Sequence, residues 1–168
     1  GPLVIISMQR SALLASVVLR VMHPEMYWAL VAMHINLGQW AFENNLSDIY
    51  THLQLWASVF NCASIICNRQ CPLHQDPRLA PEGFDLMTSV GNYSDDLMTL
   101  SSLRIQLQYN SGSMVTCSRH IIRHGFMFTG DCIIWAWFMC DSLHNFVGTP
   151  CPHYVKYMDV VQDVMVSA

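Results

Sequence analysis

The sequence predicts an α+β protein in which helices come first and a β-sandwich or jelly-roll core follows. Between Ser11 and Phe42, apolar residues recur at helical spacing. From Phe60 onward, short segments rich in β-branched and aromatic residues alternate with turn signals. The chain has 168 residues, of which 52% are hydrophobic. That is enough for one domain with a substantial core and little room for a second.

The N-terminal third is expected to hold three helices. Apolar side chains between Leu14 and Met22 have three-and-four spacing, and Pro24 suits the first turn of a new helix. We therefore predict two helices that meet near His23-Pro24. A third, short helix is predicted from Ser47 to Trp56, with Ser47 as its N-cap.

The rest of the chain contains seven short strand candidates. These are residues 60–68, 85–90, 97–100, 103–109, 114–117, 121–125 and 132–139, with turns predicted at Gly91-Asn92, Asn110-Ser111-Gly112 and Thr129-Gly130-Asp131. Helices followed by strands indicate the α+β class. We expect a single domain with helical support at 1–57, a β core at 58–146 and a C-terminal tail at 147–168.

Composition limits the function. The chain has 8 Lys+Arg against 12 Asp+Glu, a net charge of −4, and charged residues make up only 12% of it. Such a balance excludes an extended basic face for nucleic acids, so any polynucleotide would be held by a few local arginines. So few charges also suggest a fragment that relies on a flanking domain or a partner protein.

The cysteines and the apolar segments indicate the cellular compartment of the protein. There are seven cysteines, an odd number, with no CxxC pair, which favours a reduced, intracellular protein. The longest apolar stretch near the start, Ala12 to Leu19, is interrupted by Arg20 and is shorter than the roughly 20 residues of a membrane span. We therefore expect neither a transmembrane helix nor a secretory signal.

The sharpest chemical pattern is His74-Gln75-Asp76 followed, 48 residues after Asp76, by His124. Two imidazoles and one carboxylate form the facial triad of non-haem Fe(II) oxygenases, which leaves three coordination positions open. His120 competes with His124, because both would face the same way if 120–125 is a strand. A solvated turn between Pro72 and Pro77 is the alternative without a metal.

Zinc is a second alternative for the same segment. Cys67, Cys71 and His74 lie at short intervals, with Cys62 five residues before Cys67. Structural zinc sites usually have two such short-interval pairs, and the sequence offers no second one.

A wider series of motifs supports the oxygenase interpretation. The series runs Arg20–Tyr27, Asn68–Asp76, Asp85–Tyr93, Tyr109–Val115, Arg123–Gly125, Gly130-Asp131 and Phe138–His144. In this order, over roughly residues 17 to 157, it resembles the Tet/JBP-like 2-oxoglutarate and Fe(II)-dependent dioxygenases that are expanded in mushroom-forming fungi. An ordered series is far more specific than the triad alone.

The resemblance implies a double-stranded β-helix (jelly roll) and oxidation of a methyl group on a DNA base, 5-methylcytosine or N6-methyladenine. It also implies a nuclear or otherwise intracellular protein that acts in DNA demethylation. His74, Asp76 and His124 would be the Fe(II) ligands. Arg69, with Asn68 beside it, would bind the carboxylate of the cosubstrate 2-oxoglutarate, for which a guanidinium fork is well suited.

One departure from the family pattern matters. Cys132 stands where an arginine is expected for the far carboxylate of 2-oxoglutarate, and Cys140 replaces a second family-like arginine. A thiol cannot make a charge-assisted fork, so cosubstrate affinity should fall. Two further classes therefore stay open: a catalytically dead jelly-roll binding module, and a cupin-like metal protein acting on a small molecule.

Overall fold

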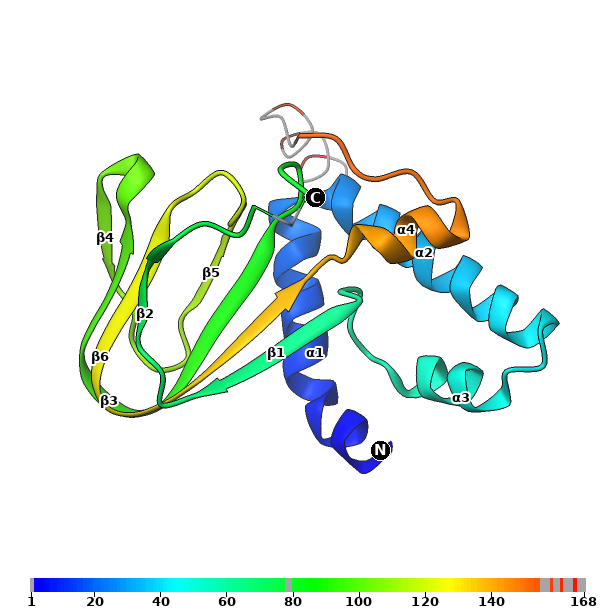
Figure 1. Cartoon of the computed structure of the whole chain (residues 1–168), viewed down its shortest axis with the longest axis horizontal. Helices are drawn as coiled ribbons and strands as arrows, with labels where there is room; N and C mark the ends of the chain where they lie inside the picture. The colour runs from blue at the N-terminus through cyan, green and yellow to red at the C-terminus, as the bar shows by residue number, and fades with distance from the viewer. Residues whose placement is uncertain (1, 78–79, 155–157, 159–160, 162–164, 166–168) are drawn as a thin grey trace. The chain divides into compact units, whose positions relative to one another are not determined.

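The α+β class is confirmed by the computed structural model, which describes residues 2–77, 80–154, 158, 161 and 165. These residues form four α-helices and one six-stranded antiparallel sheet (Figure 1). The elements are α1 Pro2–Met22, α2 Pro24–Glu43, α3 Ser47–Leu55, β1 Cys62–Cys67, β2 Cys71–His74, β3 Asp85–Leu100, the 3-10 turn η1 Ser101–Leu103, β4 Ile105–Gln108, β5 Met114–Cys117, β6 His124–Phe138 and α4 Asp141–Val147.

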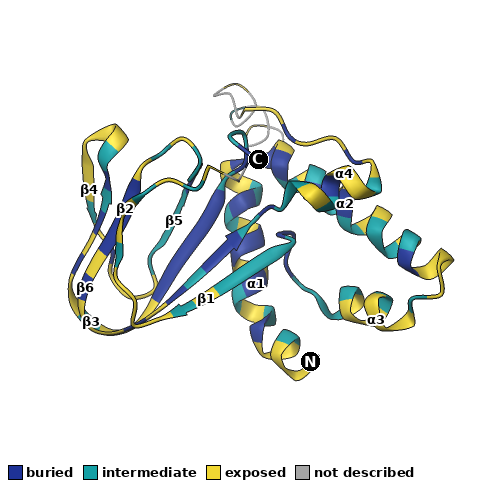
Figure 2. Ribbon diagram, viewed as in Figure 1, coloured by how far each residue is buried: buried dark blue, intermediate teal, exposed yellow. Residues whose placement is uncertain are grey.

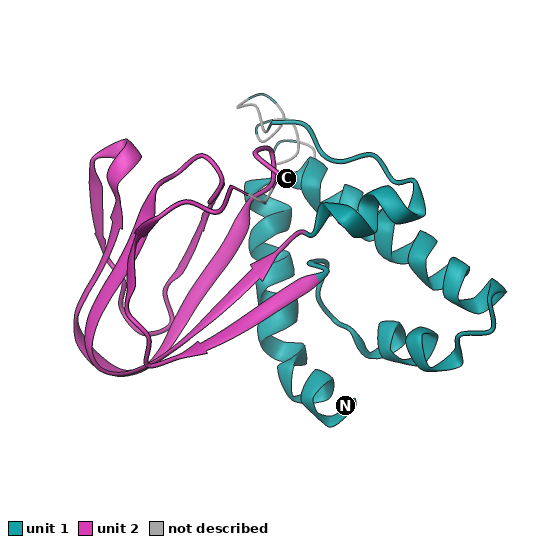
Figure 3. Ribbon diagram, viewed as in Figure 1, with its two compact units in different colours: residues 1–61, 140–168 teal, residues 62–139 magenta. Residues whose placement is uncertain are grey.

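The chain divides into two compact units (Figure 3). Residues 1–61 and 140–168 make up the helical unit, and residues 62–139 make up the β unit. Every strand lies in the β unit, and so does the whole candidate site.

In the helical unit, the predicted break between the first two helices is confirmed. His23 separates α1 from α2, and its Nδ1 accepts a hydrogen bond from the Met26 N–H at 3.3 Å, which caps α2 just before Pro24. Ser47 differs from its prediction, because it is the first helical residue of α3 and Leu46 is the N-cap. Helix α4 was missed, because its seven residues are too few for a clear apolar period.

Helix α1 extends beyond the apolar run read from the sequence. Among the described helices it alone is long and apolar enough to cross a membrane, by length and composition. Core helices and signal sequences share these two properties, so α1 is not assigned as a span.

The sheet is built around two long neighbouring strands, β3 and β6, which pair along most of their length. The order is β1-β6-β3-β4, with β2 also pairing with β6 and β5 also pairing with β3. β1 and β2 therefore follow one another along the same edge of β6, and β5 and β4 share the outer edge of β3. Strand β2 was not among the strand candidates, and pairing with β6 stabilises it despite Pro72.

Two of the predicted turns are bends within these long strands. Gly91 and Gly130 have φ values of +156° and +118° and lie on neighbouring strands, opposite Cys132 and Tyr93 respectively. A Cβ on Gly91 would overlap the Asp131 carbonyl oxygen, and one on Gly130 would lie 2.6 Å from the Asn92 carbonyl oxygen. Glycine therefore lets both strands continue through a sharp bend, where the sequence predicted separate strands.

The bends fold the sheet onto itself. Met87 and Met98 both belong to β3 and share one buried cluster. In a straight strand, eleven residue steps would place them about 36 Å apart. Figure 1 shows β3 and β6 bending together, and Figure 2 shows buried residues along both strands. The β unit thus has two facing half-sheets with a core between them.

Candidate metal centre

His74 and His124 are brought together by the pairing of β2 with β6. They are opposite one another in the register, and their ring centroids are 4.3 Å apart with the planes inclined by 50°. His124 is only 3% exposed, whereas His74 is half-buried. One ligand therefore lies in the interior and the other at the edge of the site.

Each imidazole is oriented by a backbone carbonyl two residues earlier. His74 Nδ1 lies 2.8 Å from the Pro72 oxygen, and His124 Nδ1 lies 3.0 Å from the Ile122 oxygen. Because a carbonyl oxygen only accepts hydrogen bonds, both Nδ1 atoms must carry the proton and donate. The Nε2 lone pairs are then available to a metal, which is the usual arrangement of a ligating histidine.

Asp76 lies just beyond β2, where its N–H donates to the Arg119 carbonyl oxygen at 3.0 Å. Its Oδ1 is 3.8 Å from His74 Nε2, and its Oδ2 forms a 3.1 Å ion pair with Arg119. Arg119 Nε also donates to Asp85 Oδ2 at 2.7 Å, and Asp85 is almost fully buried. The guanidinium is thereby fixed between two carboxylates, and it orients Asp76 with one oxygen toward the histidines.

His74, Asp76 and His124 form a group that can bind a metal ion. One ligand atom from each lies within 4.8 Å of the others. Ligand bonds of 2.0–2.2 Å at right angles place donor atoms about 3.0 Å apart, so small side-chain rotations would close the set. His120 does not belong to this group, because residues 118–123 form a turn before β6 begins.

Burial affects the protonation of groups around this centre. It lowers the pKa of His124 below the ordinary 6.5, opposed by the hydrogen bond to Ile122. Burial likewise raises the pKa of the Cys71 thiol, whose sulfur is 3.5 Å from His74 Nδ1, and nearby Asp76 raises it further. At neutral pH a deprotonated His124 and a protonated Cys71 are favoured, which suits metal binding by the imidazole.

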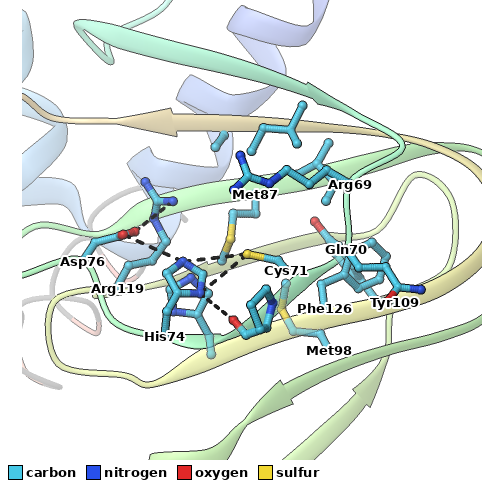
Figure 4. Close-up of a pocket in the computed structure, with 15 residues that line it drawn as sticks. Arg69, Gln70, Cys71, His74, Asp76, Met87, Met98, Tyr109, Arg119 and Phe126 are labelled. Carbon is cyan, nitrogen blue, oxygen red and sulfur yellow. Dashed lines mark hydrogen bonds and ion pairs between the residues drawn. The ribbon is translucent and has the colours of Figure 1, made fainter.

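A cavity of about 340 Å³ opens beside the three ligands (Figure 4). It is lined by Ile66, Arg69, Gln70, Cys71, Pro72, His74, Asp76, Met87, Met98, Tyr109, Arg119, His124, Phe126, Ile134 and Ala136. Residues from both half-sheets contribute, so the cavity exists because the sheet is folded. Its size is in the range of small-molecule sites.

The two residues expected to bind a cosubstrate are placed differently. Arg69 lines the cavity. Asn68 does not, because its side chain holds β6: Oδ1 accepts from the Cys132 N–H at 2.7 Å, and Nδ2 donates to Asp131 Oδ1 at 2.9 Å. With φ at +49°, Asn68 also makes the turn between β1 and β2. Asn68 therefore stabilises the connection between β1 and β2 and its contact with β6.

Cys132, the expected degenerate position, is 1% exposed and belongs to the core cluster with Tyr109 and Phe126, two of the cavity residues. It therefore lies behind the cavity wall.

The cysteines proposed for zinc do not form a metal site with His74: among the described residues, the three-ligand group with His74 contains no cysteine. Cys67 is exposed, and Cys71 alone approaches His74.

No role was predicted from the sequence for Arg119, Asp85 or Tyr109, although Asp85 and Tyr109 begin two of the family-like motifs. Asp85 is 34 residues from its partner Arg119, and no local pattern links them.

No protein-family model matches the chain, and no curated protein is similar to it.

Proposed function

We propose that the β unit is a jelly-roll oxygenase domain, a Tet/JBP-like dioxygenase that uses Fe(II) and a 2-oxo acid. The observation that carries this is the His74-Asp76-His124 group beside a cavity of about 340 Å³. Two facing half-sheets, with the first two ligands at one strand end and the third on a late strand paired with it, favour the double-stranded β-helix.

The proposed reaction is hydroxylation of a methyl group. Bound Fe(II) would supply the redox chemistry: one atom of O₂ enters the methyl as a hydroxyl, and the other enters the carboxylate formed when the 2-oxo acid loses CO₂. With 2-oxoglutarate, the cosubstrate that the resemblance implies, the coproduct is succinate.

The chain's own residues have distinct parts in this scheme. His74, Asp76 and His124 hold the metal from one side. Arg119 keeps Asp76 in position, and Arg69 provides a cation for the carboxylate of the cosubstrate. The apolar cavity walls, including Met87, exclude water from the reacting atoms.

The proposed substrate is a methylated base in DNA, 5-methylcytosine or N6-methyladenine, in the nucleus. Such a base must leave the duplex to reach a cavity, while its phosphates are held outside. The chain has only 8 Lys+Arg. We therefore expect weak duplex binding by this chain, with further basic contacts from a flanking domain or a partner protein.

The test is turnover by Fe(II)-loaded protein on duplexes that carry either methylated base, with products identified by mass spectrometry. Hydroxymethyl product that requires a 2-oxo acid and disappears in Asp76→Ala would support the proposal. Metal binding without cosubstrate binding or turnover would contradict it and favour a binding module. Turnover of a free small molecule, with DNA ignored, would instead favour the cupin-like alternative.

DNA affinity is checked separately by fluorescence anisotropy at several salt concentrations. A salt slope that corresponds to a few phosphates is expected. Tight binding with a steep slope would contradict the argument from charge.

A further inference from the structure

The part of the cavity away from the metal ligands is closed and almost entirely apolar. Tyr109, Met98 and Phe126 line it and are each at most 2% exposed. In Figure 4, Tyr109 and Phe126 lie on the opposite side of the cavity from Asp76 and Arg119. A cosubstrate that chelates the metal through its 2-oxo acid group would extend its other end toward these residues.

One polar atom at this end is buried and unsatisfied among the described residues. The Tyr109 hydroxyl is buried and makes no hydrogen bond of good geometry among the described residues. Burial raises the pKa of Tyr109 far above its usual range, and the nearby Ser89 hydroxyl offsets this only in part. The phenol therefore stays protonated and can donate one hydrogen bond to a ligand acceptor.

The hydrogen bonds around Tyr109 hold its backbone in place. Its carbonyl oxygen accepts from the Tyr93 hydroxyl at 3.0 Å, and Tyr93 also bonds Ser89 at 2.6 Å. Its N–H donates to the Asp96 carbonyl oxygen at 2.9 Å. The ring is thus fixed before any ligand arrives, which lowers the entropic cost of using its hydroxyl.

The charges behind this end are unfavourable for an anion. Asp96 is 8% exposed, and its Oδ2 has no hydrogen-bond partner among the described residues. Its charge acts on Cys132, where it adds to burial in raising the pKa of the thiol. A carboxylate beside Tyr109 would therefore meet a neutral thiol and a neighbouring negative charge.

The two cations that line the cavity, Arg119 and Arg69, differ in their surroundings. Arg119 is held by Asp76 and Asp85, beside the metal ligands. Arg69 is exposed, so an anion that it binds stays at the solvent side of the cavity.

We propose that this cavity selects a 2-oxo acid whose far end is uncharged, with an apolar tail or a neutral acceptor that bonds the Tyr109 hydroxyl, in preference to 2-oxoglutarate. The inference rests on the proposed function, because it assumes that a 2-oxo acid chelates the metal. It goes further by giving the chemical class of the cosubstrate. Burying a carboxylate without a cationic partner is strongly unfavourable, whereas an ester or alkyl end gains from burial.

The experiment is calorimetric titration of Mn(II)-loaded protein with three probes. These are 2-oxoglutarate, its 5-methyl ester and 4-methyl-2-oxopentanoate. We expect both uncharged-tail acids to bind at least about tenfold more tightly than 2-oxoglutarate. In Tyr109→Phe, the ester should lose about fivefold in affinity, whereas 4-methyl-2-oxopentanoate, which has no acceptor at its far end, should be unchanged.

A reversal variant tests the charge argument. Cys132→Arg places a cation beside Asp96 and behind Tyr109, and 2-oxoglutarate should then bind about ten- to a hundredfold more tightly than to the wild type. Circular dichroism of each variant establishes that it is folded. If Cys132→Arg does not fold, the affinities of wild type and Tyr109→Phe for the three acids still test the cosubstrate inference.

The outcomes separate the two proposals. If 2-oxoglutarate binds the wild type as tightly as its ester, and Tyr109→Phe changes neither, the cosubstrate inference fails while the oxygenase proposal stands. If Mn(II) binds and none of the three acids does, both fail.

Discussion

His74 and His124 face one another across the β2–β6 pair, and each donates its Nδ1 proton to the backbone carbonyl two residues before it. One ligand atom of each histidine lies within 4.8 Å of a carboxylate oxygen of Asp76, and His74 Nε2 is 3.8 Å from Asp76 Oδ1. The strand pairing therefore assembles the site before a metal binds.

The choice between the two candidate distal histidines is tested by a matched pair of variants. His124→Ala should weaken Mn(II) or Co(II) binding at least a hundredfold, because it removes one of three ligands. His120→Ala should leave the affinity within about threefold, because His120 lies outside the ligand group. Calorimetry measures both affinities, and equal losses in the two variants would show that the third ligand is misassigned.

The buried ion pair of Arg119 with Asp85 is expected to affect metal affinity, although neither residue is a metal ligand. In Asp85→Asn, Arg119 loses one of its two anionic partners and pairs more strongly with Asp76, so it competes with the metal for that carboxylate. Metal affinity should fall about 10- to 100-fold, as for other groups that orient ligands. Asp95→Asn is the control, because Asp95 is an exposed residue on the same strand. An unchanged affinity in Asp85→Asn would contradict this role.

The bend of β3 requires glycine at position 91. Gly91→Ala forces a Cβ into the Asp131 carbonyl at a φ that side chains rarely adopt, so it should destabilise the protein by about 2 kcal/mol or more. Gly38→Ala in α2 meets nothing within 4 Å and should stabilise by about 0.5–1 kcal/mol. Urea unfolding measures both changes. A Gly91→Ala protein as stable as wild type would mean that β3 does not bend there.

The stability of the metal-free protein should fall as the pH drops below about 6.5. Burial lowers the pKa values of His34, His124 and His144 in the folded chain below the ordinary 6.5. Below that pH the unfolded chain binds protons that the folded chain does not, so acid favours unfolding until the lowered folded pKa values are reached. Above it, these groups contribute no pH dependence.

Urea midpoints at pH 8, 7, 6 and 5.5 measure this dependence. His124→Asn should reduce the slope between pH 7 and 5.5, because it removes one of the three groups. Stability that rises from pH 7 to 5.5 would contradict the prediction.

Local sequence patterns predicted three of the four described α-helices and much of the candidate site. Apolar periodicity and Pro24 located the break between α1 and α2, because these signals act within a few residues. The short segment at 114–117, with β-branched Val115 and Thr116, predicted β5 with its observed ends. The His74-Gln75-Asp76 triplet was visible because its two ligands are only two positions apart in the sequence.

Pairing between distant segments decided the rest. It made the glycine positions 91 and 130 into bends of continuous strands, because each is hydrogen-bonded on both sides of the bend to its neighbour. It selected His124 over His120 by starting β6 at residue 124. It also placed Arg119 between Asp76 and Asp85 and turned Tyr109 toward the cavity. A sequence period specifies which face of one segment is apolar, but which side chains meet depends on the register between segments, and only the folded sheet sets that register.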